Sequence, residues 1–185
     1  MKRIIAFLMM LCMFLSFTGC AAHASNETEP MTTAAERAML DGTAEELLSE
    51  IIAENPVEFM GGVTTLDISD TTDNGTWIIK SNTGLDNAEL ISEAALFGPM
   101  MGSMAFSMVM VRVKDPANAQ TVAQKMRDGV DMRKWICVEA NELMVAGYGD
   151  VVMLIMLDNG QGMSAQAFVD AFGTICGGDL DFVIS

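Results

Sequence analysis

The sequence predicts an α+β fold, a two-layer sandwich in which a mostly antiparallel sheet carries helices on one face. Three observations lead to this prediction. Segments with the two-residue periodicity of strands come in pairs joined by short links, and segments with helical periodicity separate those pairs. Each helical segment has one apolar face that a sheet must cover. No internal repeat or second domain is evident, so one domain over residues 43–185 is expected.

The first predicted helix begins after a capping box. Thr43 and Glu46 are three residues apart, so the hydroxyl and the carboxylate can each accept a hydrogen bond from a backbone N–H of the first turn. The helix is expected to end near Asn55-Pro56. Four apolar residues recur at helical spacing along it: Leu47, Leu48, Ile51 and Ile52.

A hairpin is expected after this helix. Residues 63–68 and 77–80 have the composition of short strands, and Asp73-Asn74-Gly75 between them is a tight-turn signal. Residues 85–97 then form a strand or a short helix, which Gly98-Pro99 ends.

Residues 105–114 predict a strand with two apolar faces. Such a strand is expected near the centre of a sheet, where both of its faces are covered. The residues alternate between the two faces, with Ala105, Ser107, Val109, Val111 and Val113 on one and Phe106, Met108 and Met110 on the other.

The chain then alternates between helix and strand up to residue 185. Asp115-Pro116 supplies an N-cap and a first helical residue, and Gly129 suits the end of that helix. Residues 142–146 and 150–157 predict a hairpin, Ser164 is expected to cap a last helix, and residues 180–184 form an edge strand. The inward-facing residues of the two helices are Ala119, Val122, Ala123 and Met126 in the first and Phe168, Val169 and Phe172 in the second.

The N-terminus has the pattern of a secretory signal. Lys2 and Arg3 precede an apolar run over residues 4–17, which is shorter than the roughly 20 apolar residues that a membrane-spanning helix needs. Its end, Phe17-Thr18-Gly19-Cys20, resembles a bacterial lipoprotein signal. That resemblance implies cleavage before Cys20 and a diacylglyceryl group on its sulfur, which would hold the protein at the outer face of the cytoplasmic membrane.

A second cleavage site competes with lipidation. Ala22-His23-Ala24 fits a general signal peptidase, which would cut after Ala24 and release a soluble secreted protein. Under the lipoprotein reading, residues 1–19 are the signal peptide and residues 20–42 are the lipidated cysteine with a flexible tether.

Four segments of the domain carry a resemblance to a known family: Ser92-Glu93-Ala94-Ala95, Met108-Val109-Met110-Val111-Arg112-Val113-Lys114-Asp115, Met132-Arg133-Lys134-Trp135-Ile136-Cys137-Val138-Glu139-Ala140 and Gly149-Asp150-Val151-Val152-Met153-Leu154. They resemble a family of small lipoproteins of Gram-positive bacteria, which is defined only as a domain of unknown function. The resemblance implies an exported α+β domain and brings no active site.

Charge and residue types exclude several functions. The chain has 25 acidic and 10 basic residues, a formal net charge of −15 that becomes −17 without Lys2 and Arg3, which argues against nucleic acid as a partner. Its one histidine, His23, precedes the domain, so a histidine-based nucleophile system and a zinc site are not expected.

The sequence favours a non-enzymatic module, without a cofactor, that binds a protein, a peptide or an envelope component. The alternative is a small carboxylate-dependent cell-wall hydrolase.

Three groups of residues are candidates for a site. Soft thioethers of Met100, Met101 and Met104 suggest a Cu(I)-binding protein, against which core packing is the simpler interpretation. Cys137 and Cys176 form a disulfide closing a loop of about 40 residues, or remain two thiols. A basic window is either a patch for an anion or an acidic partner, or a solvated rim: Arg112, Lys114, Lys125, Arg127, Arg133 and Lys134.

Overall fold

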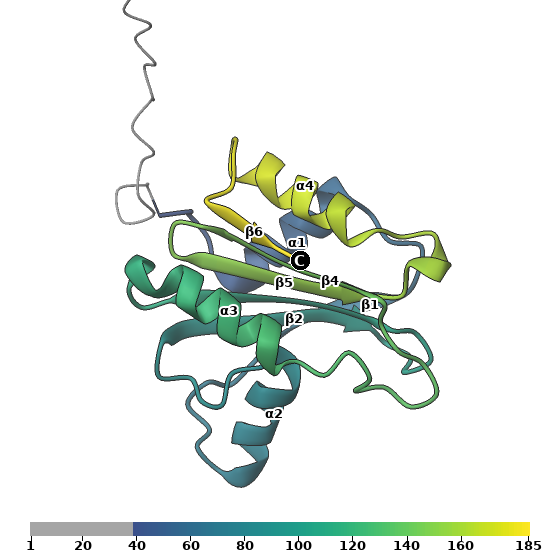
Figure 1. The fold of residues 1–185 in the computed structure, drawn as a ribbon, viewed down its shortest axis with the longest axis horizontal. Helices are drawn as coiled ribbons and strands as arrows, with labels where there is room; N and C mark the ends of the chain where they lie inside the picture. Colours follow the sequence, from purple (N-terminus) through teal and green to yellow (C-terminus); the bar gives the residue numbers. More distant parts are fainter. Residues whose placement is uncertain (1–38) are drawn as a thin grey trace, which may run out of the picture. The chain divides into compact units, whose positions relative to one another are not determined.

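A six-stranded antiparallel sheet forms the centre of the domain (Figure 1). The computed structural model describes residues 39–185, so the predicted signal peptide, Cys20, the competing site at Ala24 and most of the predicted tether lie outside the described residues. The strands lie in the order β1-β2-β3-β5-β4-β6. They are β1 (Gly61–Thr65), β2 (Ile91–Pro99), β3 (Phe106–Val113), β4 (Glu142–Tyr148), β5 (Val151–Leu157) and β6 (Phe182–Ile184).

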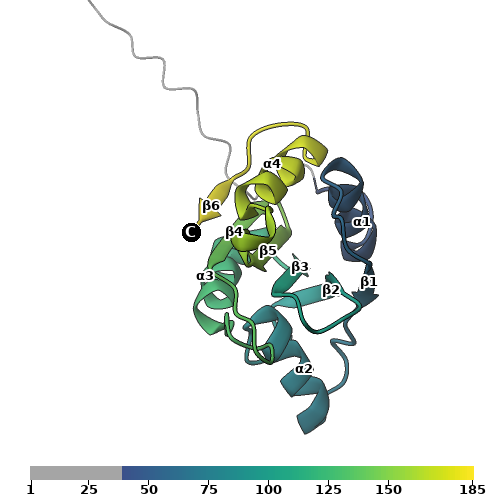
Figure 2. The same cartoon turned by 90° about the vertical axis from the view of Figure 1, so that its right-hand side faces the viewer.

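Helices cover both faces of this sheet (Figures 1 and 2). One face packs on α1 (Ala44–Glu54) and α4 (Ala165–Ile175), and the other on α2 (Asp73–Thr83) and α3 (Ala119–Gly129). The α+β class and the antiparallel sheet are confirmed. The placing of all helices on one face was wrong, and the protein has three layers where two were expected.

The reason for the third layer lies in β3 and β5. Every residue of both strands is buried, and the alternation predicted for β3 is present. Phe106, Met108 and Met110 face α1 and α4, while Val109 and Val111 face α2 and α3. A sheet whose central strands are apolar on both faces needs a cover on each side.

Local sequence signals place α1 and α3 as expected. At α1, the Thr43 N–H donates to Glu46 Oε2 (2.8 Å) and the Glu46 N–H donates to Thr43 Oγ1 (3.2 Å), which completes the capping box. The predicted stripe of α3 is fully buried. A short 3₁₀ turn, Pro116–Asn118, precedes α3, and the Asp115 side chain caps that turn.

The predicted hairpin over residues 63–80 was wrong, because residues 73–83 form α2. Thr72 is the N-cap and its hydroxyl accepts a hydrogen bond from the Gly75 N–H (3.2 Å). Gly75, Ile79 and Thr83 are buried at four-residue spacing, the period of a helix. A Cβ on Gly75 would lie 2.3 Å from the backbone oxygen of Asp70, so this glycine permits a close approach and does not mark a turn.

The C-terminal third follows the predicted order of hairpin, helix and edge strand. β4 pairs with β5, and β6 pairs with the outer edge of β4. Ser164 occupies the N-cap of α4, but its side chain makes no capping hydrogen bond. Glu142 Oε2 instead accepts from the Ala165 N–H (2.7 Å), and this bond, with a second from the Asn159 side chain, lowers the pKa of the Glu142 carboxyl.

In the part of the chain that the structure describes, no helix has the length and apolar character needed to cross a membrane.

Candidate functional site

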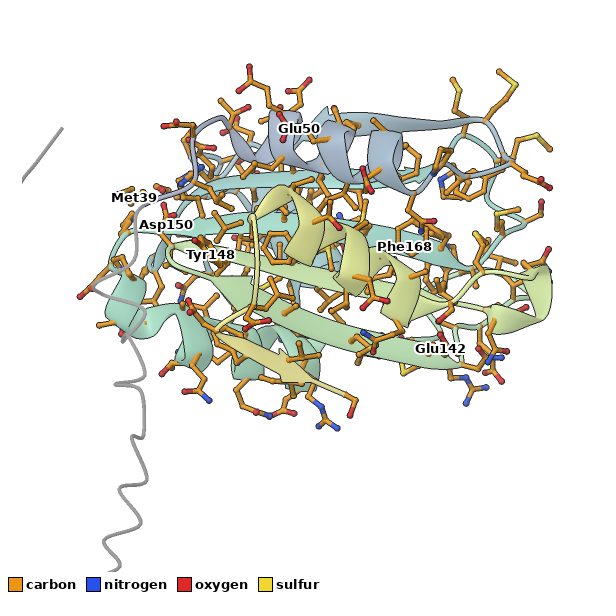
Figure 3. All side chains as sticks on the ribbon, turned by 90° about the horizontal axis from the view of Figure 1, so that it is seen from above. Met39, Glu50, Glu142, Tyr148, Asp150 and Phe168 are labelled. Atoms are coloured by element: carbon orange, nitrogen blue, oxygen red, sulfur yellow. The ribbon has the colours of Figure 1, made fainter. Side chains whose placement is uncertain are left out.

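The register of the sheet separates two ends of the domain. Arg112 lies opposite Val151 at one end of β3, and Phe106 lies opposite Leu157 at the other. Six residue steps along a strand place these ends about 20 Å apart. In Figure 3, Met39, Tyr148 and Asp150 mark the first end and Glu142 the second, where several sulfur-tipped side chains project. We call the first end of the sheet the arginine end, defined by Arg112 and Asp150. We call the second the methionine end, defined by Met60, Met100, Met101 and Met104.

At the arginine end, a buried guanidinium holds the first described residues of the chain. Arg112 Nη2 donates to the carbonyl oxygens of Leu40 (3.0 Å) and Gly42 (2.5 Å). Its Nη1 pairs with Asp150, which is 0 % exposed. The ordered domain therefore begins no later than Leu40, earlier than the predicted tether boundary at residue 42.

Two carboxylates complete this cluster. Glu93 Oε2 lies 3.9 Å from Arg112 Nε and accepts a hydrogen bond from the Ala44 N–H (2.9 Å) at the start of α1. Asp150 Oδ1 is buried without a hydrogen-bond partner among the described residues. The Asp150 charge is therefore balanced within the described domain by Arg112, and the cluster joins α1, β2, β3 and the N-terminal segment.

The other residues of the basic window do not converge on Arg112. Lys114 Nζ donates to the Glu89 carbonyl (2.8 Å), and Arg133 pairs with Glu139 (3.1 Å). Arg127 donates to the Ser185 carbonyl oxygen, and Lys125 lines a cavity between α2 and α3. The window is split between the two faces of the sheet, so the structure does not bring its six side chains into one patch.

Lys134, like Arg112, is partly withdrawn from solvent, but it lies on the other face of the sheet. Its Nζ donates to Asn82 Oδ1 (3.1 Å) and Ser107 Oγ (3.1 Å), which ties α2 to β3. Burial lowers the pKa of the Lys134 ammonium group from its usual 10.5 to about 8. Ser107 is only 2 % exposed, so its hydroxyl is out of reach of a substrate, and the pair serves packing better than nucleophilic catalysis.

Lys134 gives the domain a predicted dependence of stability on pH. In the unfolded chain its pKa is near 10.5, so between pH 8 and 10.5 the unfolded state binds more protons than the folded state. Raising the pH through this window removes the cost of burying the charge, and the free energy of unfolding should rise by about 1–2 kcal/mol from pH 7.5 to 9.5. Urea denaturation of wild type and Lys134→Met checks this. The variant should lack the rise, and equal pH slopes in the two proteins would contradict the prediction.

At the methionine end, exposed thioethers from two distant segments come together. Met60, Met100 and Met101 are 78 %, 73 % and 73 % exposed, and the Met100 N–H donates to the Met60 carbonyl oxygen (2.9 Å). Met104 lies in the same loop, partly buried against the core. The sequence pointed to three of these residues. It missed Met60, because only the pairing of Gly61 with Pro99 places residue 60 beside residue 100.

Met104 also lines a cavity of about 620 Å³. The cavity lies between the segment after α1 and the start of α4, and Phe59 and Phe168 both line it. Ring contacts from Phe106 to Phe59 (5.1 Å between centroids) and to Phe168 (5.3 Å) fix these two walls. We call this space the distal cavity; its other lining residues are Asn55, Pro56, Val57, Glu58, Met104, Gln161, Gly162, Met163, Ser164 and Ala167.

The two cysteines of the domain are not joined in the structure. Cys176 packs against the core beneath α1 and α4. Cys137 is exposed, and its neighbours Trp135 and Val138 pack against the opposite core. The sheet therefore lies between them, and the disulfide alternative is not what the structure contains.

Comparisons with family models, with curated proteins and with solved structures find no match to this chain. Within residues 39–185, no three or more His, Cys, Asp or Glu side chains gather in a way that would hold a metal ion. We take the methionine end, where three thioethers are exposed, together with the distal cavity, which Met104 lines, as the candidate site.

Proposed function

We propose that the protein is an exported bacterial lipoprotein of the small Gram-positive type, held at the outer face of the cytoplasmic membrane through Cys20. Support comes from the apolar run over residues 4–17 and the small residues before Cys20. The intact mass of the protein purified from its native membrane tests this. A chain that begins at a diacylglyceryl-modified Cys20 is expected, and an unmodified N-terminus at Ser25 would contradict it.

We further propose that the domain is a non-enzymatic binding module for a protein or peptide segment. The observation that carries this is the distal cavity, which has aromatic walls and is lined by Met104 of the methionine end. Methionine is flexible and polarizable and is common at surfaces that adapt to apolar partners. The cavity is large enough for an apolar side chain, and such concave sites are where ligands are usually bound.

The charge of the domain indicates which peptide segments would bind in the distal cavity. The chain carries a formal net charge of −15, and Glu58 lies at the cavity without an ion-pair partner among the described residues. An apolar side chain flanked by Lys or Arg would therefore be attracted, while an acidic segment would be repelled.

Filling the distal cavity tests the proposal. Ala167 is exposed on α4 and lines the cavity, whereas Ala53 is exposed on α1 and does not. After chemical crosslinking in intact cells, wild type and Ala53→Trp should give the same adduct, and Ala167→Trp should lose it. An adduct that persists in Ala167→Trp would contradict binding at this site.

The alternative function, a carboxylate-dependent cell-wall hydrolase, is tested in the same preparation. A zymogram containing cell-wall material should show no clearing at the position of the purified protein. Clearing that disappears when a carboxylate is replaced by its amide would overturn the binding-module proposal.

A further inference from the structure

The exposed methionines at the end of the sheet have a chemistry beyond apolar contact. A thioether sulfur is a soft, neutral donor, which suits Cu(I) and is a poor ligand for Mg²⁺ or Ca²⁺. The fully buried methionines of the described domain, such as Met108, Met110 and Met153, belong to the hydrophobic core, and core packing explains their presence. Packing does not account for Met60, Met100 and Met101, which are each more than two-thirds exposed.

The sheet register gives these three side chains a shared location. Gly61 lies opposite Pro99, and the hydrogen bond from the Met100 N–H to the Met60 carbonyl continues this pairing by one residue. Side chains of residues opposite each other in a ladder leave the same side, with Cβ atoms about 4.5–5.5 Å apart. Met101 follows directly in the bend, and Met104 lies in the same loop. Long, unbranched side chains from these positions can turn their sulfurs toward a common point.

We propose that Met60, Met100 and Met101, with Met104 at the base, bind one soft monovalent cation, Cu(I). The ion binds as Cu(I) and undergoes no redox step at the site. The negative charge of the chain and the nearby Glu58 favour a cation, while neutral sulfurs provide the selectivity. This inference is independent of the peptide-binding proposal, since a sulfur-dependent ligand and an apolar one respond differently to replacement of methionine by leucine.

Titration of the purified mature protein with Cu(I) under anaerobic, reducing conditions tests the site. All proteins in this titration, the parent included, carry Cys137→Ser, because the exposed Cys137 thiol is a competing soft ligand for Cu(I). One equivalent of Cu(I) should remain bound against a weak competing chelator. The triple variant Met60→Leu/Met100→Leu/Met101→Leu keeps the apolar volume and removes the sulfurs, and its affinity should fall at least about tenfold, the scale on which loss of one supporting group weakens a metal site.

The matched control is Met39→Leu, which removes an exposed thioether at the arginine end and should bind Cu(I) like the parent. Ag(I), which is inert to redox chemistry, locates the ion by NMR of the methionine methyl groups. The signals of Met60, Met100 and Met101 should shift, and those of Met108 and Met110 should not. Binding no tighter than the weak chelator, equal affinity in the triple variant, or equal shifts at Met39 would each overturn the proposal.

Discussion

Replacing Arg112 with methionine is expected to lower the free energy of unfolding by about 3–5 kcal/mol, the cost of leaving one charge of a buried pair alone. Asp150 is 0 % exposed, and its charged partner in the described domain is Arg112. The substitution also removes the two hydrogen bonds that hold the carbonyls of Leu40 and Gly42. Urea denaturation measures the effect, with the same slope of unfolding free energy against urea concentration used for wild type and variant.

A double variant separates the charge from the packing. In Arg112→Met/Asp150→Asn no fully buried charge is left unpaired, because Glu93, the other carboxylate of the cluster, is 38 % exposed, so about half of the lost stability should return. Arg127→Met is the control, because Arg127 is 40 % exposed and should change stability by less than about 0.5 kcal/mol. If the Arg112 and Arg127 variants unfolded at the same urea concentration, the cluster would have no structural importance.

Gly129→Ala is expected to destabilise the protein by about 2–4 kcal/mol, as overpacking against a rigid neighbour does. A Cβ at residue 129 would lie 2.0 Å from the backbone oxygen of Gly84, where α2 ends in the left-handed conformation. Helix propensity alone predicts the opposite sign, a gain of about 1 kcal/mol for alanine over glycine. The sign of the measured change therefore decides whether the ends of α2 and α3 touch as the structure has them.

The matched control for this substitution is Gly102→Ala, since nothing lies within 4 Å of a Cβ at residue 102. Thermal denaturation of both variants should leave the Gly102 variant close to wild type and lower the melting temperature of the Gly129 variant. A Gly129→Ala protein as stable as wild type would contradict the close contact.

Where local signals agree with packing, the sequence predicted the fold well. The capping box at Thr43 and the stripe through Val122 and Met126 are present as expected. The hairpin of β4 and β5 and the edge strand β6 follow the same pattern. In each case the hydrophobic periodicity and the residues at the ends of the segment predict the same helix or strand.

The failures occur where a local signal has two meanings. Asp73-Asn74-Gly75 suits a hairpin turn, but Thr72 caps a helix there, and Gly75 is needed for the approach of Asp70. The two apolar faces of β3 identified a central strand, yet the number of covering layers depends on where the helices connect. Residue propensity and hydrophobic pattern do not specify on which face of the sheet each helix packs.

The candidate site was predicted only in part for a similar reason. Clustering along the chain drew attention to Met100, Met101 and Met104, but Met60 joins them through strand pairing across 40 positions. The basic window was also a cluster along the chain, and there β3 sends Arg112 and Ser107, the partner of Lys134, to opposite faces. Nearness in sequence does not decide nearness in space.

We propose that the domain binds its partner at the methionine end, away from the arginine end where the first described residues, Leu40 and Gly42, contact Arg112. The most direct test is to place a photoreactive amino acid at Ala167, at Ala53 or at Asp179 in intact cells and to compare the crosslinked products. Ala167 lines the distal cavity, and the other two positions do not. A discrete adduct from position 167 alone is predicted, and adducts of equal yield from all three positions, or from positions 53 or 179 only, would contradict it.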